Sequence, residues 1–77
     1  MHELSLMDDL VRVITEEMAE VEVHVVRLEL GESAGVMAAS LRFCFDVCIQ
    51  GTALEGARLE IVPTNGNSLN LKEVEVA

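Results

Sequence analysis

The spacing of apolar residues changes repeatedly along these 77 residues, and this pattern constrains the fold more than any other feature. Residues 3–19 place apolar side chains three and four apart, which predicts an amphipathic helix. Residues 23–30 alternate apolar with charged side chains, as a strand with one buried face does. Residues 34–50 return to helical spacing, whereas residues 59–62 and 69–76 have strand character. We therefore expect helix, strand, helix, strand and strand, in that order.

A few residues mark where these elements should end or bend. Ser33 is a candidate N-cap for the second helix, and Gly51 should end that helix. Residues 63–68 are dense in turn-forming side chains. In the last strand, the apolar parity switches near Lys72 and Glu73, which suggests a β-bulge.

The order of the elements predicts the fold class. A strand–helix–strand crossover makes the first two strands parallel, and a hairpin through residues 63–68 reverses the third. We expect an α/β (α+β) fold in which two helices cover one face of a small mixed three-stranded sheet. Residues 1–77 are too few for more than one domain.

Composition excludes several classes of function. The net charge is −9 with five Lys and Arg residues, so the surface repels nucleic-acid phosphates and anionic membranes. No apolar stretch is long enough to span a bilayer, and the N-terminus does not resemble a signal peptide. We find no nucleophile with a base, no phosphate-binding glycine loop and no recognisable frame of paired carboxylates. The sequence therefore indicates a protein without enzyme activity.

The two cysteines, Cys44 and Cys48, lie four residues apart on the apolar stripe of the second predicted helix. We interpret them as small core residues. Two thiols on one segment do not form a disulfide framework, and reduced thiols indicate a cytoplasmic protein.

Several segments together carry a family resemblance, namely residues 1–6, which begin Met1-His2-Glu3, and residues 26–32, 41–46, 51–52, 54–61 and 69–76. In this order they resemble the nickel-binding domain of the HypA family, whose members help to insert nickel into [NiFe]-hydrogenase and, in some bacteria, into urease. The resemblance implies a nickel-binding metallochaperone domain with Ni(II) as its metal. The implied partners are HypB, the nickel-handling maturation GTPase, and the hydrogenase large subunit. Homodimerisation stays open.

One departure from the family concerns zinc. Members of the family carry a zinc ribbon with two Cys-x-x-Cys pairs between the second and the last strand. Residues 63–68 stand at that place here, and Cys44 and Cys48 cannot supply a four-thiolate site. We therefore expect the zinc-binding domain to be absent near residues 63–68, and we expect no zinc to bind. A junction inside a turn favours deletion from a longer member over a naturally short one.

The N-terminal residues Met1, His2 and Glu3 are the predicted metal ligands. The α-amine of Met1, the amide and ring nitrogens of His2, and the amide of Glu3 can close two five-membered rings and one six-membered ring in a plane. Square-planar nitrogen ligation suits Ni(II) and Cu(II). The tripeptide alone also fits an exposed histidine followed by a favourable charge in the first helical turn. The resemblance favours the ligand role for His2, whereas His24 is most simply a solvent-facing strand residue.

A second function agrees with the same residues. The chain would then be a non-metal interaction module that docks the maturation partners but cannot deliver nickel without its zinc domain. Metal binding at the N-terminus distinguishes the two hypotheses.

Overall fold

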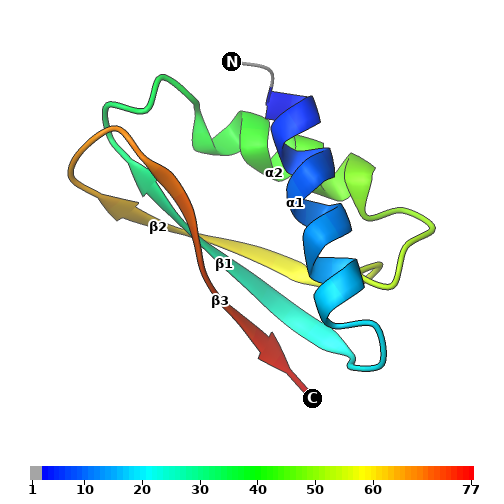
Figure 1. The fold of residues 1–77 in the computed structure, drawn as a ribbon. Helices are drawn as coiled ribbons and strands as arrows, with labels where there is room; N and C mark the ends of the chain where they lie inside the picture. The colour runs from blue at the N-terminus through cyan, green and yellow to red at the C-terminus, as the bar shows by residue number, and fades with distance from the viewer. Residues whose placement is uncertain (1–2) are drawn as a thin grey trace.

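A computed structural model describes residues 3–77, in which two helices pack on one face of a three-stranded sheet (Figure 1). The elements are α1 (Glu3–Glu17), β1 (Val23–Gly31), α2 (Ala38–Cys48), β2 (Arg58–Thr64) and β3 (Leu69–Val76). The predicted fold class and order of elements are confirmed. Within residues 3–77, neither helix is long and apolar enough to span a bilayer.

The central strand of the sheet is β1, because the strand order is β2-β1-β3. β1 pairs in parallel with β2 and antiparallel with β3. The expected hairpin is therefore wrong in one respect: β3 does reverse direction, but it pairs with β1 and not with β2. In this position β3 sets Val74 beside the fully buried Val26 and extends the apolar face of the sheet.

The predicted bulge in β3 is confirmed. Arg27 of β1 pairs with Glu73, whereas the next residue, Leu28, pairs with Leu71. Lys72 is thus the extra residue of the bulge. Because of this extra residue, Leu71 and Val74 both point to the side of the sheet on which the helices pack.

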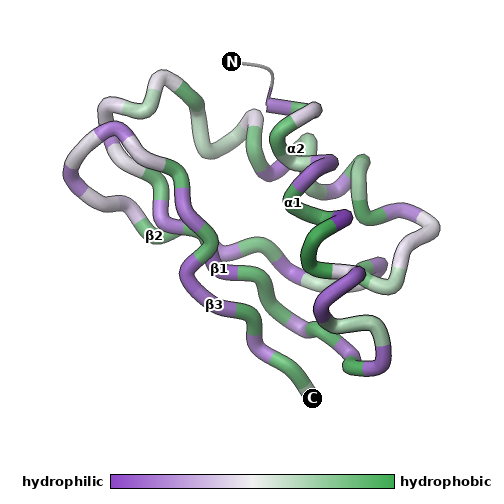
Figure 2. The backbone as a smooth tube through the Cα atoms, viewed as in Figure 1, coloured by the Kyte–Doolittle hydropathy of each residue, from purple (hydrophilic) through white to green (hydrophobic). Residues whose placement is uncertain are grey.

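The core lies between the helices and the sheet, where green hydrophobic segments of the chain face one another (Figure 2). The side chains that are at most 2% exposed are Met7, Ile14, Val26, Leu28, Leu41, Phe45 and Leu54. With no Trp or Tyr in the sequence, this core is almost entirely aliphatic.

The second helix begins later than predicted, and Ser33 is not its N-cap. α2 starts at Ala38 after Met37, whose side chain makes no capping hydrogen bond. Ser33 lies instead in a loop that is held to the β2–β3 connection, where its N–H donates to the carbonyl oxygen of Gly66 at 2.8 Å. The helical spacing of residues 34–37 is therefore overridden by a tertiary contact. At the other end, Gly51 follows the helix with a φ of 75°, a left-handed conformation that suits glycine.

Candidate functional site

The predicted metal ligands lie at the start of α1. Met1 and His2 are outside the described residues, and Glu3 is the first residue of α1. The first N–H groups of a helix have no acceptor within the helix. The amide nitrogen of Glu3 can therefore serve as a metal ligand without breaking a helical hydrogen bond.

The first turn of α1 packs against the end of α2. The Sγ atom of Cys48 donates to the carbonyl oxygen of Leu4 at 3.9 Å, and a shallow depression opens beside this contact. Burial raises the pKa of the Cys48 thiol, and the charges of Asp8 and Cys44 raise it further. The thiol is therefore protonated at neutral pH, which suits a packing residue better than a nucleophile or a metal ligand.

The two cysteines differ in their surroundings. Cys44 is 8% exposed and belongs to the core, as expected, whereas Cys48 is only partly buried at the α1–α2 contact. Both lie on one helix, so they do not fit a four-thiolate zinc site. Across residues 3–77, no three His, Cys, Asp or Glu side chains converge in a way that could hold a metal ion.

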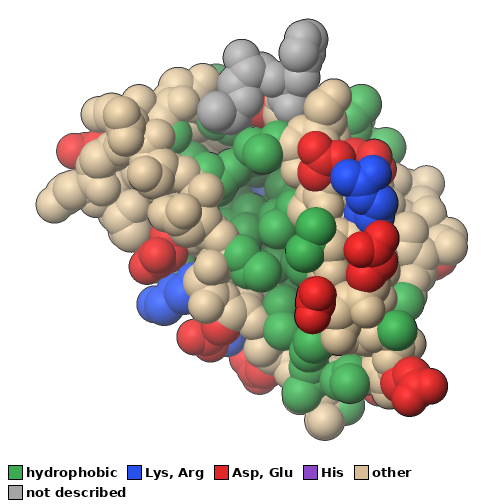
Figure 3. Space-filling view, viewed as in Figure 1, with side chains coloured by type: hydrophobic (Ala, Val, Ile, Leu, Met, Phe, Trp, Pro, Cys, Tyr) green, Lys and Arg blue, Asp and Glu red, His purple; other side chains and the backbone are tan. Residues whose placement is uncertain are grey.

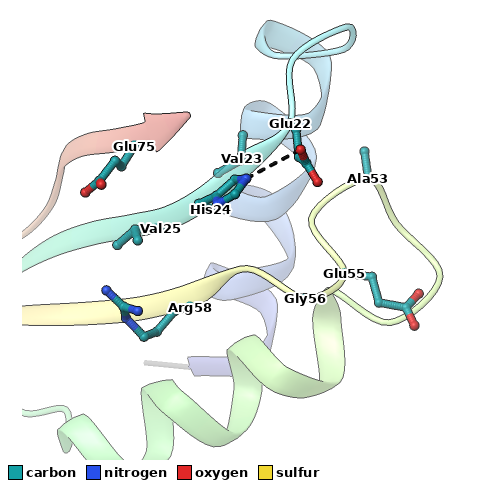
Figure 4. A pocket seen from close by; sticks show the side chains of 9 residues that line it. All are labelled: Glu22, Val23, His24, Val25, Ala53, Glu55, Gly56, Arg58 and Glu75. Atoms are coloured by element: carbon teal, nitrogen blue, oxygen red, sulfur yellow. Dashed lines mark ion pairs between the residues drawn. The ribbon is translucent and has the colours of Figure 1, made fainter. Parts of the chain in front are cut away.

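The histidine of β1, His24, borders a polar depression of about 440 Å³ at the start of the strand (Figure 4). Its Nε2 atom lies 3.4 Å from a carboxylate oxygen of Glu22, and both side chains are more than half exposed. Arg58 and Glu75 line the depression from the neighbouring strands. His24 is therefore solvent-facing, as predicted, in an open site where water screens its pairing with Glu22.

Arg27, in the middle of β1, contacts three carboxylates. Its Nε donates to Glu60 of β2 at 2.8 Å, while its two terminal nitrogens donate to Glu73 at 2.8 Å and Glu75 at 2.6 Å, both on β3. The hydrogen bond to Glu75, followed by that to Glu60, raises the pKa of Arg27. Hydrogen bonds from Arg58 and Arg27 lower the pKa of Glu60. This Arg27 cluster joins all three strands through their side chains.

Sequence reasoning missed the Arg27 cluster, because Arg27 is 33 to 48 residues away from its three carboxylate partners and meets them only through strand register. One signal was present in the sequence. Glu73 and Glu75 alternate with Val74 and Val76, which places two carboxylates on one face of a strand. A cation on the neighbouring strand would be the expected partner for such a pair.

Comparison with known proteins connects this fold to one family. The sequence profile of the family described as "Hydrogenase/urease nickel incorporation, metallochaperone, hypA" matches residues 1–76. A hydrogenase maturation factor HypA of Rippkaea orientalis is 46% identical over 66 residues, which are 86% of this chain and 58% of the relative. Another HypA, from Cereibacter sphaeroides, is 48% identical over 73 residues, covering 90% of this chain and 64% of that protein. The chain thus spans less than two thirds of these relatives.

A solved structure shares the fold. The solution structure of the Ni metallochaperone HypA from Helicobacter pylori superimposes with a TM-score of 0.72, covering 100% of this chain and 87% of that one. The sequence identity of this pair is 15%, so the match concerns the fold alone.

Proposed function

Because the chain belongs to the HypA family of hydrogenase and urease nickel-incorporation metallochaperones, we propose that it carries one Ni(II) ion at Met1, His2 and Glu3. The ion is cargo, taken up and passed on. Nickel delivery to [NiFe]-hydrogenase would involve HypB and the hydrogenase large subunit. Urease would be a second recipient of nickel, because the family description names it beside hydrogenase.

The chemistry of the N-terminal nitrogens supports this ligand set. When Met1 is the free N-terminus, its amine, two successive amides and the imidazole of His2 supply four nitrogens in one plane, a geometry that Ni(II) accepts. The position of Glu3 at the start of α1 leaves its amide without a helical acceptor. Metal binding at this point therefore does not compete with the helix.

The other histidine offers a much poorer site. His24 has Glu22 beside it, but the described residues contain no cluster of three potential ligands. A single imidazole with one exposed carboxylate does not provide a four-coordinate site. This contrast between the two histidines supports the N-terminal assignment and supplies a matched control.

A nickel titration tests the proposal. The parent chain, with an unblocked N-terminus, should bind one Ni(II) and show the d–d absorption of a square-planar complex. His2→Ala should lose that band, whereas His24→Ala should keep it at the same stoichiometry. Equal nickel binding by His2→Ala and the parent would refute the proposed ligands.

The proposal includes the expectation that this chain binds no zinc. We propose that the β2–β3 connection stands where longer members of the family carry their zinc-binding domain, so this chain should not need zinc to fold. The interaction-module hypothesis is the alternative, and it requires docking surfaces on the folded domain. A blocked N-terminus, discussed below, separates carriage from docking.

A further inference from the structure

A strip of apolar side chains lies exposed between α1 and β3. It consists of Leu10 and Val13 on α1 with Leu71, Val74 and Val76 on β3, and we call it the α1–β3 strip. Val13 is 49% exposed, and Leu71 and Val76 are each 42% exposed. Figure 3 shows an apolar surface running between α1 and the strands, bordered by acidic side chains. The apolar surface in Figure 3 is extended, unlike single apolar residues scattered over a protein.

The strip is open because the two helices do not cover the third strand. α2 packs along the flank of α1 that carries Leu4, where Cys48 makes its contact, and also contacts β2. By helical geometry, Leu10 and Val13 lie on the opposite flank of α1. The strand pairs Leu28–Leu71 and Val26–Val74 turn β3 side chains toward the same face. That face of β3 therefore has apolar side chains but no helix above it.

The occupant must bind mainly through side chains. The bulge at Lys72 interrupts the regular hydrogen-bonding pattern of β3, and a lysine on an edge strand disfavours pairing with another strand. An elongated apolar surface without a regular strand edge instead fits the apolar stripe of a helix. A helix placed there would continue the helical layer over β3, beside α1.

Charge defines the chemistry of that helix. α1, which borders the strip, carries five acidic residues and one arginine, whereas Glu73 and Glu75 of β3 are bound to Arg27 on the opposite face of the sheet. A second copy of this chain would bring another net charge of −9 to the same surface. We propose that the α1–β3 strip docks an amphipathic helix of a partner protein, whose apolar stripe is flanked by Lys and Arg. This inference does not depend on nickel binding at the N-terminus.

A synthetic Leu/Lys peptide with leucines at i, i+3, i+4 and i+7 tests the proposal by fluorescence anisotropy. It should bind the parent chain, whereas a scrambled peptide of the same composition and a Leu/Glu version should not. Val13→Ser and Leu71→Ser, made together, remove apolar area without changing the charge and should weaken binding about tenfold. Phe43→Ser is the matched control, because Phe43 is 69% exposed on α2 and lies outside the strip. Circular dichroism should show the same fold in all variants.

Four outcomes would overturn the proposal. Equal binding of the scrambled peptide would show that net charge alone, and not the apolar stripe, accounts for the binding. Equal binding by the double serine variant would place the site elsewhere. Self-association of the parent that disappears in this variant would make a second copy the occupant. Tighter binding of an alternating Val/Lys peptide, with protection of β3 amides from hydrogen exchange, would indicate strand addition.

Discussion

A β-carbon on Gly31 would lie 2.5 Å from the carbonyl oxygen of Gly66, closer than such atoms approach in proteins. Gly31 ends the central strand, and Gly66 belongs to the connection that crosses over this end from β2 to β3. The N–H of Gly31 donates to the carbonyl oxygen of Ser68 at 2.8 Å, and that of Glu32 donates to Thr64 at 3.0 Å. The sheet order β2-β1-β3 therefore requires a residue without a side chain at position 31.

Gly31→Ala should destabilise the protein by about 1–3 kcal/mol, the usual cost of forcing extra volume into a packed site. The atoms that a methyl group would meet are backbone atoms, which cannot move aside as a flexible side chain can. Urea unfolding followed by circular dichroism measures the effect. Ser33→Ala is the control, because it keeps the backbone hydrogen bonds of this crossing. A Gly31→Ala variant as stable as the parent would show that the connection does not pack on β1 in this way.

The Arg27 cluster should make stability depend on pH in the acid range. The pKa of Glu60 is lowered from 4.5 in the folded protein, so the folded state favours the ionised carboxylate. This contribution is fully present above pH 4.5 and is lost as the pH falls through the lowered folded value. The free energy of unfolding should therefore decrease on acidification through this range, and Glu60→Gln should reduce the decrease.

Glu29→Gln provides the matched control for that experiment. Glu29 lies on β1, the strand next to that of Glu60, and the substitution removes the same charge, but no ion pair or side-chain hydrogen bond is found for Glu29 among residues 3–77. The acid dependence of Glu29→Gln should follow that of the parent. If Glu60→Gln and Glu29→Gln respond alike, the hydrogen bonds that Arg58 and Arg27 donate to Glu60 do not contribute to the acid dependence.

The two thiols should differ in their reactivity. Cys48 is partly exposed with a raised pKa, and Cys44 is buried in the core. Iodoacetamide should modify Cys48 first, at a rate that rises with pH up to and beyond the ordinary thiol value of 9.0. Cys44 should react only as the protein unfolds. Mass spectrometry of peptides after timed alkylation gives both rates, and faster modification of Cys44 would contradict the packing of α2.

Folding should not require zinc. The aliphatic core is made by both helices and all three strands, and the two cysteines do not form a four-ligand site. The far-ultraviolet circular dichroism spectrum should therefore be unchanged by a strong chelator. Unfolding under this treatment, reversed by added zinc, would show that the cysteines bind metal.

A blocked N-terminus should separate nickel carriage from partner docking. Acetylation of Met1, or one residue added before it, removes the terminal amine from the predicted chelate and leaves the described fold unchanged. The blocked protein should lose nickel binding and, in a full-length context, fail to support hydrogenase maturation, yet bind HypB with nearly the affinity of the parent. Normal maturation by the blocked protein would favour the interaction-module hypothesis. Loss of HypB binding would instead show that the N-terminus is part of the docking surface.

Local patterns in the sequence predicted the elements and several details of them. The order of helices and strands, the bulge at Lys72, the core position of Cys44 and the exposed position of His24 all follow from spacing within one segment. Such patterns are local because a helix repeats every 3.6 residues and a strand every two. The predicted nickel ligands Met1, His2 and Glu3 rest on an equally local pattern together with the family resemblance, and they stay a prediction.

Tertiary structure decided what depends on register and on the order of strands. Spacing within β3 could not indicate that β3 pairs with β1, and the late start of α2 depends on the contact between Ser33 and Gly66. The Arg27 cluster exists because three strands align Arg27 with Glu60 and Glu73. The open α1–β3 strip exists because two helices cannot cover three strands equally. These features join residues that are far apart in the chain, so the local period of the sequence carries no information about their partners.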